Sequence, residues 1–155
     1  MFSHLLLCTH GSAGAILAED LVCTDIVVRN PDLAVTVLTV VNEDWRHMTG
    51  DDWLNTSCVR KTFLTLVDDT LAREIEEEWQ RLRATHPVAE DFGFRKTMGP
   101  VAETIAATAR DLDCDLIVMG PFQKKHTKGL KARMTNKELH PLLPCPLLIA
   151  PQRGV

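Results

Sequence analysis

Short apolar runs alternate with longer amphipathic stretches along this chain. The run at residues 33–41 is nearly continuous and rich in β-branched residues, as is typical of a parallel strand covered on both faces. Similar runs predict four more strands, and the one at residues 92–98 is the weakest because Gly93 interrupts it. The five strands are expected at residues 4–9, 33–41, 92–98, 115–120 and 147–150.

Between these runs, apolar residues recur every three or four positions, which predicts amphipathic helices. In the first helix we expect Leu17, Leu21 and Val28 to share one face. Pro87 ends the longest helix, and Pro100 stands where the next one is expected to begin. The helices are expected at about residues 13–29, 58–85, 100–112 and, in part, 131–143, with a long polar loop at 42–57.

Strands that alternate with helices predict one α/β domain over residues 1–155, with a doubly wound parallel sheet and helices on both faces. In such a sheet, ligands bind at the carboxyl ends of the strands, where the direction of winding changes. The loops at residues 9–14 and 120–129 are therefore the candidate site.

Composition argues against several classes of protein. The chain has 17 Lys and Arg residues against 21 Asp and Glu residues, a formal charge of −4, whereas a general nucleic-acid binder is usually basic. Its 5 cysteines form no C-x-x-C pair and its 6 histidines are scattered, so we expect reduced cysteines and no metal site. The apolar stretch near the first residue is too short for a signal peptide or a membrane span, and we expect a cytoplasmic protein.

Positive charge is concentrated in one stretch, since no acid lies between Leu116 and Lys137. Outside this stretch, 11 of the 17 positive residues face 21 acids, a charge of −10. Such a local field can attract a phosphate or another anion, and the alternative is a solvated loop that offsets nearby acids. The basic residues are Lys124, Lys125, Lys128, Lys131, Arg133 and Lys137.

The sequence HGSAG at residues 10–14 is similar to a nucleophile elbow, in which a serine stands at a strand-to-helix turn. However, His10 replaces the first glycine of that motif, and no base can be assigned to activate Ser12. The alternative is a helix N-cap, in which Ser12 or Thr9 accepts a backbone N–H. We therefore expect no catalytic residues and no enzymatic activity.

Three segments carry a resemblance to a known family: a strand ending in HGS, the segment VAETIAATARDLDCDLIVMG, and the ending PCPLLIAP. Together, over residues 3–151, they resemble the universal stress proteins. The resemblance implies a HUP-like nucleotide-binding fold with a five-stranded parallel sheet in the order 3-2-1-4-5. It also implies a site between the ends of strands 1 and 4, where many members bind ATP. Those members use an aspartate that ends strand 1 and a motif after strand 4 that reads G-x-x-G, nine residues, then G-[ST].

This chain departs from the family's nucleotide motif at most of the marked positions. His10 stands at the aspartate position, and Gly120 matches the first glycine. Gln123, Arg133 and Met134 stand at the three remaining marked positions. Glycines let backbone N–H groups approach phosphate oxygens, so these side chains predict a degraded nucleotide site. The G-x-x-Q form resembles the universal stress protein A type, whose members lack the motif and act as homodimers.

The resemblance implies a stress-response protein that acts as a homodimeric interaction or regulatory module, with no bound cofactor. The first alternative is a sensor that binds ATP or AMP between strands 1 and 4, and the second is a weak hydrolase or nucleotidyl-transfer enzyme on the same sheet. If a nucleotide binds, the expected contacts are Thr9, His10, Gly11, Ser12, Val40, Met119, Gly120, Lys124 and Lys125.

The last strand predicts how two chains would associate. Leu147, Leu148 and Ile149 form an apolar terminal strand, which is expected at an edge of the sheet. Pairing of this edge across a two-fold axis gives a closed dimer, and the resemblance implies the same antiparallel pairing. The alternative is an edge that Pro146 and Pro151 protect. The expected partners are a second copy and other proteins, with neither nucleic acid nor a membrane.

Overall fold

The computed structural model describes residues 2–9, 13–41, 57–120 and 139–151. The polar loop at 42–56 and the basic stretch at 124–137 lie outside the described residues. The strands are β1 (His4–Cys8), β2 (Ala34–Val41), β3 (Gly93–Met98), β4 (Leu116–Met119) and β5 (Leu147–Ile149). The helices are α1 (Ala13–Leu21), α2 (Val27–Arg29), α3 (Ser57–Thr85) and α4 (Val101–Asp111). A π-helical segment η1 (Val22–Ile26) joins α1 to α2, and η4 (Pro87–Asp91) and η5 (His140–Leu142) are 3₁₀ turns.

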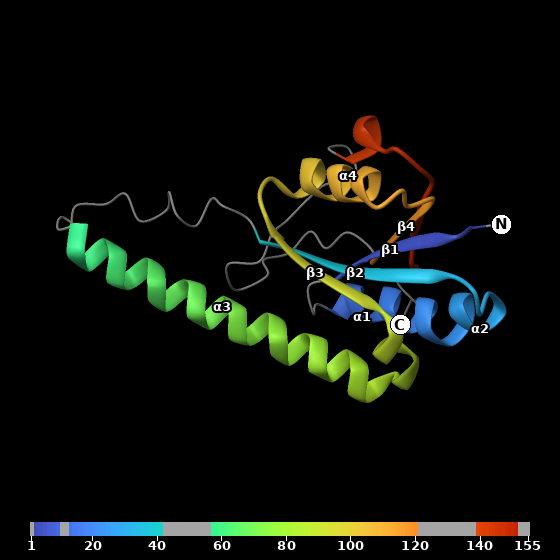
Figure 1. Cartoon of the computed structure of the whole chain (residues 1–155), viewed down its shortest axis with the longest axis horizontal. Helices are drawn as coiled ribbons and strands as arrows, with labels where there is room; N and C mark the ends of the chain where they lie inside the picture. The colour runs from blue at the N-terminus through green and yellow to red at the C-terminus, as the bar shows by residue number, and fades with distance from the viewer. Residues whose placement is uncertain (1, 10–12, 42–56, 121–138, 152–155) are drawn as a thin grey trace.

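The strands form one five-stranded sheet in the order β3-β2-β1-β4-β5, and every pair is parallel (Figure 1). This confirms the predicted α/β fold and the strand order that the resemblance implies. The predicted strands agree with the structure to within a residue or two at each end. Within the described residues, no helix is both long enough and apolar enough to cross a membrane.

Both faces of the inner strands are covered, which explains why β1, β2 and β4 are largely apolar without alternation, whereas the edge strand β3 carries exposed polar residues. Leu5 and Leu7 of β1 pack in one core with residues of α1, α2 and the last turns of α3. Leu6 of β1 packs in a second core on the opposite face, beneath α4. All three leucines are 0% exposed, and burial of each is worth about 2 kcal/mol. Figure 1 shows α4 on one side of the sheet and α1, α2 and α3 on the other.

The π-helical segment changes which residues of the first helical stretch are buried. The N–H of Val27 donates to the carbonyl of Val22, five residues earlier, so one extra residue enters the turn. Val27 is 8% exposed as a result, whereas Val28 is 69% exposed. Leu17 and Leu21 pack against the core as expected. The prediction that Val28 shares their face is wrong, because a regular helical period does not hold across the π segment.

The start of β1 is fixed to the start of β4 by one carboxylate. The Asp115 side chain accepts hydrogen bonds from the N–H of Ser3 at 2.8 Å, the hydroxyl of Ser3 at 3.0 Å and the N–H of His4 at 3.0 Å. Burial acts to raise the pKa of this carboxyl, but the hydrogen bonds from Ser3 and His4 outweigh it and lower the pKa. Ionised Asp115 therefore stabilises the pairing of β1 with β4.

Candidate functional site

The direction of winding changes between β1 and β4, which are neighbours in the sheet but not in the sequence. The register pairs Leu7 with Val118, so the chain continues past the carboxyl ends of these strands at Thr9 and Gly120. Of the residues expected to contact a nucleotide, Thr9, Val40, Met119 and Gly120 are described. The others lie outside the described residues: His10, Gly11, Ser12, Lys124 and Lys125.

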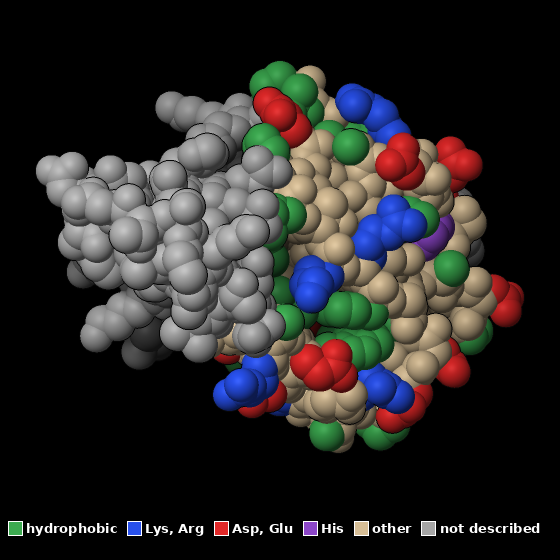
Figure 2. All heavy atoms as spheres, turned by 60° about the vertical axis from the view of Figure 1, so that its left-hand side comes forward, with side chains coloured by type: hydrophobic (Ala, Val, Ile, Leu, Met, Phe, Trp, Pro, Cys, Tyr) green, Lys and Arg blue, Asp and Glu red, His purple; other side chains and the backbone are tan. Residues whose placement is uncertain are grey.

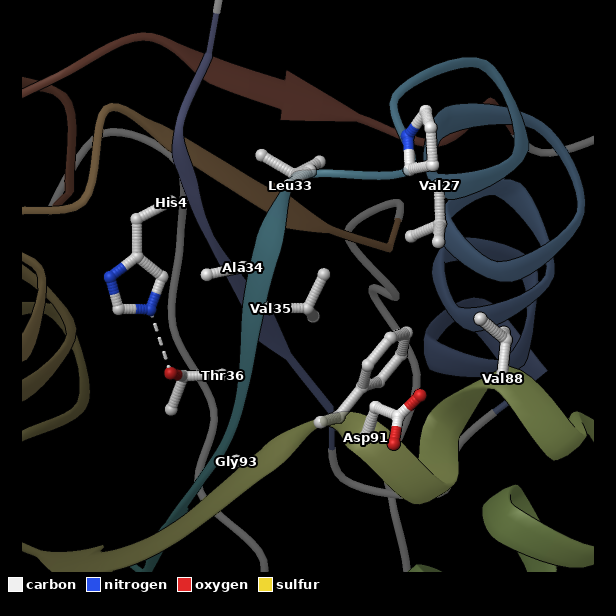
Figure 3. A pocket seen from close by; sticks show the side chains of 11 residues that line it. His4, Val27, Leu33, Ala34, Val35, Thr36, Val88, Asp91 and Gly93 are labelled. Atoms are coloured by element: carbon white, nitrogen blue, oxygen red, sulfur yellow. Dashed lines mark hydrogen bonds between the residues drawn. The ribbon is translucent and has the colours of Figure 1, made fainter.

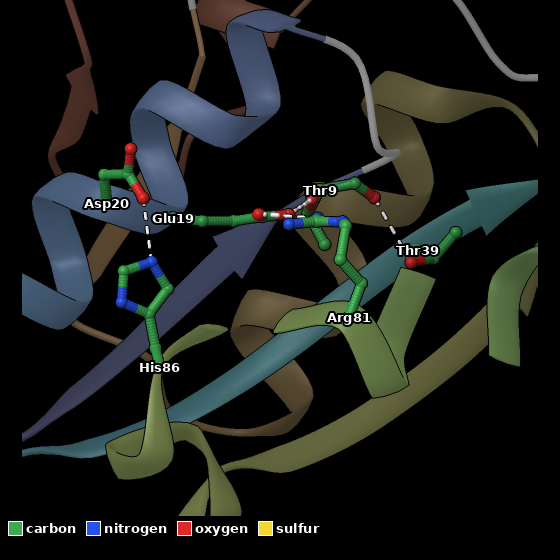
Figure 4. Close-up of polar contacts among 6 residues, drawn as sticks. All are labelled: Thr9, Glu19, Asp20, Thr39, Arg81 and His86. Carbon is green, nitrogen blue, oxygen red and sulfur yellow. Dashed lines mark hydrogen bonds and ion pairs between the residues drawn. The ribbon is translucent and has the colours of Figure 1, made fainter. Parts of the chain in front are cut away.

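Every polar atom of Thr9 is engaged inside the protein, and Figure 4 shows its contacts with Glu19 and Thr39. Its N–H donates to the carbonyl of Leu38 at 3.0 Å, and its own carbonyl accepts from the hydroxyl of Thr39 at 3.2 Å. Its hydroxyl donates to the carboxylate of Glu19 on α1. Thr9 is 8% exposed. The residue that follows β1 therefore presents its hydrogen-bonding groups to the fold and not to the surface.

Glu19 is a buried carboxylate that the sequence analysis did not single out. Its side chain is 1% exposed, and Nη2 of Arg81 on α3 lies 2.8 Å from its Oε2. The guanidinium supplies the charge that a buried carboxylate needs. At the next residue of α1, Oδ1 of Asp20 lies 2.8 Å from Nε2 of His86, which directly follows α3. The signal in the sequence was the phase of Glu19, which falls on the buried face with Ala15 and Val22.

The side chain of Val40 faces the core, and the backbone carbonyl of Met119 joins β4 to the end of β5. The side chain of Val40 belongs to the core beneath α4 and is 8% exposed. The carbonyl of Met119 accepts a hydrogen bond from the N–H of Ala150 at 2.9 Å. The carbonyl of Val41 accepts one from the N–H of Gly99 at 2.9 Å. At the described strand ends, these carbonyls are therefore already used in joining one strand to the next.

Gly120 lies where the first turn of α1 passes the end of β4. A Cβ atom at this position would lie 2.1 Å from the carbonyl oxygen of Gly14 and 2.8 Å from the backbone nitrogen of Ala15. A Cβ atom does not approach non-bonded backbone atoms this closely, so the close packing here favours glycine. Packing of α1 against β4 is thus sufficient to explain a glycine at position 120, without any ligand.

The described thiols are poor nucleophiles. Burial raises the pKa of Cys8 and of Cys23 to about 12, with smaller contributions from neighbouring cysteines and acids respectively. Burial likewise raises the pKa of Cys114 to about 11. A thiol must ionise to attack, so these cysteines are unreactive at neutral pH. Across the described part of the chain, no three His, Cys, Asp or Glu side chains are grouped so that they could hold a metal ion.

One face of the described residues carries charges of both signs. Figure 2 shows a face on which acidic and basic side chains are interspersed and hydrophobic side chains occur in small groups. A nucleic-acid interface would instead present a basic patch or stripe. The described residues on this face form no such patch.

Comparison with known proteins identifies the family. The model of the universal stress protein family matches residues 1–151. The chain belongs to this family. No curated protein matches it.

Solved structures share the fold of this universal stress protein. The hypothetical protein MJ0577, whose biochemical function was assigned from its structure, is 18% identical with a TM-score of 0.74, over 100% of this chain and 99% of its own. The universal stress protein UspA from Lactobacillus plantarum is 18% identical with a TM-score of 0.64, over 96% and 97% of the two chains. A universal stress protein solved in complex with cAMP is 15% identical with a TM-score of 0.60, over 97% of each chain.

Proposed function

We propose that this protein acts in the stress response as a homodimeric interaction or regulatory module, and that the carboxyl ends of β1 and β4 do not hold a nucleotide. The observation that carries the proposal is the internal engagement of Thr9. A nucleotide at this end of the sheet would need hydrogen-bonding groups that are free to meet it. To free the hydroxyl of Thr9, its contact with buried Glu19 would have to break.

The sequence around Gly120 supports the same proposal. Gly120 is required by the close approach of Gly14, so its presence does not imply a phosphate site. The other marked positions of the family motif hold Gln123, Arg133 and Met134. The family motif has glycine or a small hydroxyl residue at these positions, and glycine is what lets backbone N–H groups approach phosphate oxygens closely.

The edge strand β5 supports dimerisation. It is the last strand of the sheet, beside β4, and its outer side has no neighbouring strand within the described residues. Leu148 is 39% exposed on this strand, which is a large exposed fraction for a leucine in a sheet. A second copy paired across a two-fold axis would cover both the edge and this side chain.

Calorimetric titration with Mg-ATP, preceded by mass spectrometry for retained nucleotide, tests the site. We expect no heat of binding and no retained nucleotide. Light scattering after gel filtration tests the assembly, and we expect a dimer that Leu148→Lys converts to a monomer. Val28→Lys is the matched control, because Val28 is even more exposed but lies on α2, and it should leave the dimer intact. A wild-type monomer would contradict the dimer proposal.

A nucleotide sensor is the second candidate. The meeting of β1 and β4 at the change of winding favours it, as does the cAMP held by a universal stress protein of the same fold. Binding of Mg-ATP in the micromolar range, about −8 kcal/mol, would place this candidate first. Release of phosphate or AMP that is lost in the Lys124→Ala, Lys125→Ala double variant would instead indicate an enzyme.

A further inference from the structure

A cavity of about 320 Å³ opens at the amino ends of the strands (Figure 3). The site described above lies at the other end of the strands, their carboxyl ends. It is lined by His4, Ala34 and Gly93, the first residues of β1, β2 and β3, and by residues of α2 and η4. We call it the amino-end cavity. Its volume lies at the lower end of the range for small-molecule sites, about 300–1,000 Å³.

The cavity follows from the register of two strands. Pairing of β2 with β3 begins at Thr36 and Gly93, so Ala34 and Val35 extend beyond the start of β3. The space beside this uncovered edge is closed by Val27 of α2 and by Val88 of η4. Figure 3 shows Val27, Val35 and Val88 on the same side of β2. The π-helical segment contributes directly, because it turns Val27 inward in place of its neighbour.

The polar groups of the cavity differ in what they already bind. Nδ1 of His4 lies 3.0 Å from the carbonyl of Leu112, and Nε2 lies 2.8 Å from the hydroxyl of Thr36, so that ring and that hydroxyl are partnered. The carboxylate of Asp91 lines the cavity on the side of Val88 (Figure 3). Among the described residues, no hydrogen bond or ion pair reaches it. The charged group that a ligand would meet here is therefore a carboxylate beside an apolar wall.

We propose that the amino-end cavity binds small amphipathic amines, with the ammonium group beside Asp91 and an apolar body against Val27, Val35 and Val88. A carboxylate attracts a cation and repels an anion, and apolar walls favour a short hydrocarbon or aromatic body. The same charge disfavours nucleotides and other phosphates. The proposal does not rest on the proposed function, because it concerns the other ends of the strands.

Amide chemical shifts of the ¹⁵N-labelled full chain test the proposal, with three probes that share one body and differ in charge. The probes are 2-phenylethylamine, 2-phenylethanol and 3-phenylpropanoate, each titrated at neutral pH to about 10 mM. We expect the amine to shift the amides of Ala34 and Gly93, with a dissociation constant on the order of 1 mM. The alcohol should bind more weakly, and the carboxylate should not bind.

Two variants separate the charge from the apolar wall. Asp91→Asn should weaken binding of the amine about threefold and leave binding of the alcohol unchanged. Val88→Ala should weaken both probes to a similar extent. Asp111→Asn is the matched control, because Asp111 is an exposed aspartate at the end of α4, outside the cavity, and it should change neither.

Three results would overturn the proposal. The first is that no probe shifts the amides of Ala34 and Gly93. The second is that the amine and the carboxylate bind equally well. The third is that Asp91→Asn leaves the preference for the amine over the alcohol unchanged.

Discussion

Replacement of Gly120 by alanine tests whether packing of α1 against β4 requires this glycine. The added Cβ would lie 2.1 Å from the carbonyl oxygen of Gly14 and 2.3 Å from its carbonyl carbon. These are backbone atoms in the first turn of α1, so no rotation of a side chain relieves the contact. The helix or the end of β4 has to move, and the cores that both elements share have to repack.

The expected cost is large for the addition of one methyl group. Overpacking of a well-packed region destabilises by about 1–3 kcal/mol, and backbone contacts this short place Gly120→Ala at about 3 kcal/mol. For a chain of this length, that corresponds to a melting temperature lower by about 6–12 °C. Urea unfolding followed by circular dichroism measures the free energy of unfolding directly.

Gly93→Ala is the matched control, because the same group is added at the start of β3. Its nearest neighbour would be the hydroxyl of Thr36 at 3.4 Å, an ordinary contact. We expect a change of less than about 1 kcal/mol in either direction, since alanine also restricts the unfolded chain. If Gly120→Ala unfolds at the same urea concentration as Gly93→Ala, the packing explanation for Gly120 is refuted.

Three further predictions concern buried and hydrogen-bonded groups. Asp115→Ala should cost more stability at pH 7 than at about pH 2.5. The pKa of Asp115 in the folded protein lies below its ordinary 3.8, so the stability that its carboxylate contributes is lost as the pH falls through that lower value. An equal loss at both pH values in urea unfolding would contradict this. Arg81→Met should lower the free energy of unfolding by about 2 kcal/mol. This is less than the full penalty for breaking a buried ion pair, because the side chain of Arg81 is 37% exposed. Adding Glu19→Gln to the same chain should recover part of that loss. Simple additivity of these two substitutions in urea unfolding would argue against the pair. Iodoacetamide at pH 8 should leave Cys8 unmodified in the native protein and label it in urea, since burial raises its pKa to about 12, and peptide mass spectrometry measures the difference.

The sheet was predictable because burial on both faces leaves a simple pattern. The apolar runs located each strand to within a residue or two, and the helical period located α3 to within one residue at its start. The order of the strands was not contained in the periodicity, which cannot distinguish one right-handed winding from another. It came from the resemblance to the family.

The errors arose where an interaction depends on residues far apart in the sequence or on a change of helical geometry. The shift from Val28 to Val27 depends on a hydrogen bond that spans five residues, and regular periodicity carries no sign of it. The pairing of Glu19 with Arg81 joins residues 62 positions apart. A charged residue on the buried face of α1 was visible in the sequence, but its partner was not.

The carboxyl end of the sheet illustrates why a single glycine that matches a family motif is weak support for a nucleotide site. Gly120 matches the first position of the family motif, yet the contact with Gly14 already excludes any larger residue there. The fold therefore requires this glycine whether or not phosphate binds. The motif positions held by Gln123 and Arg133 carry the greater weight, because the family's glycines there serve the close backbone approach that phosphate needs. A family member can lose its ligand and keep Gly120, and we propose that this chain has done so.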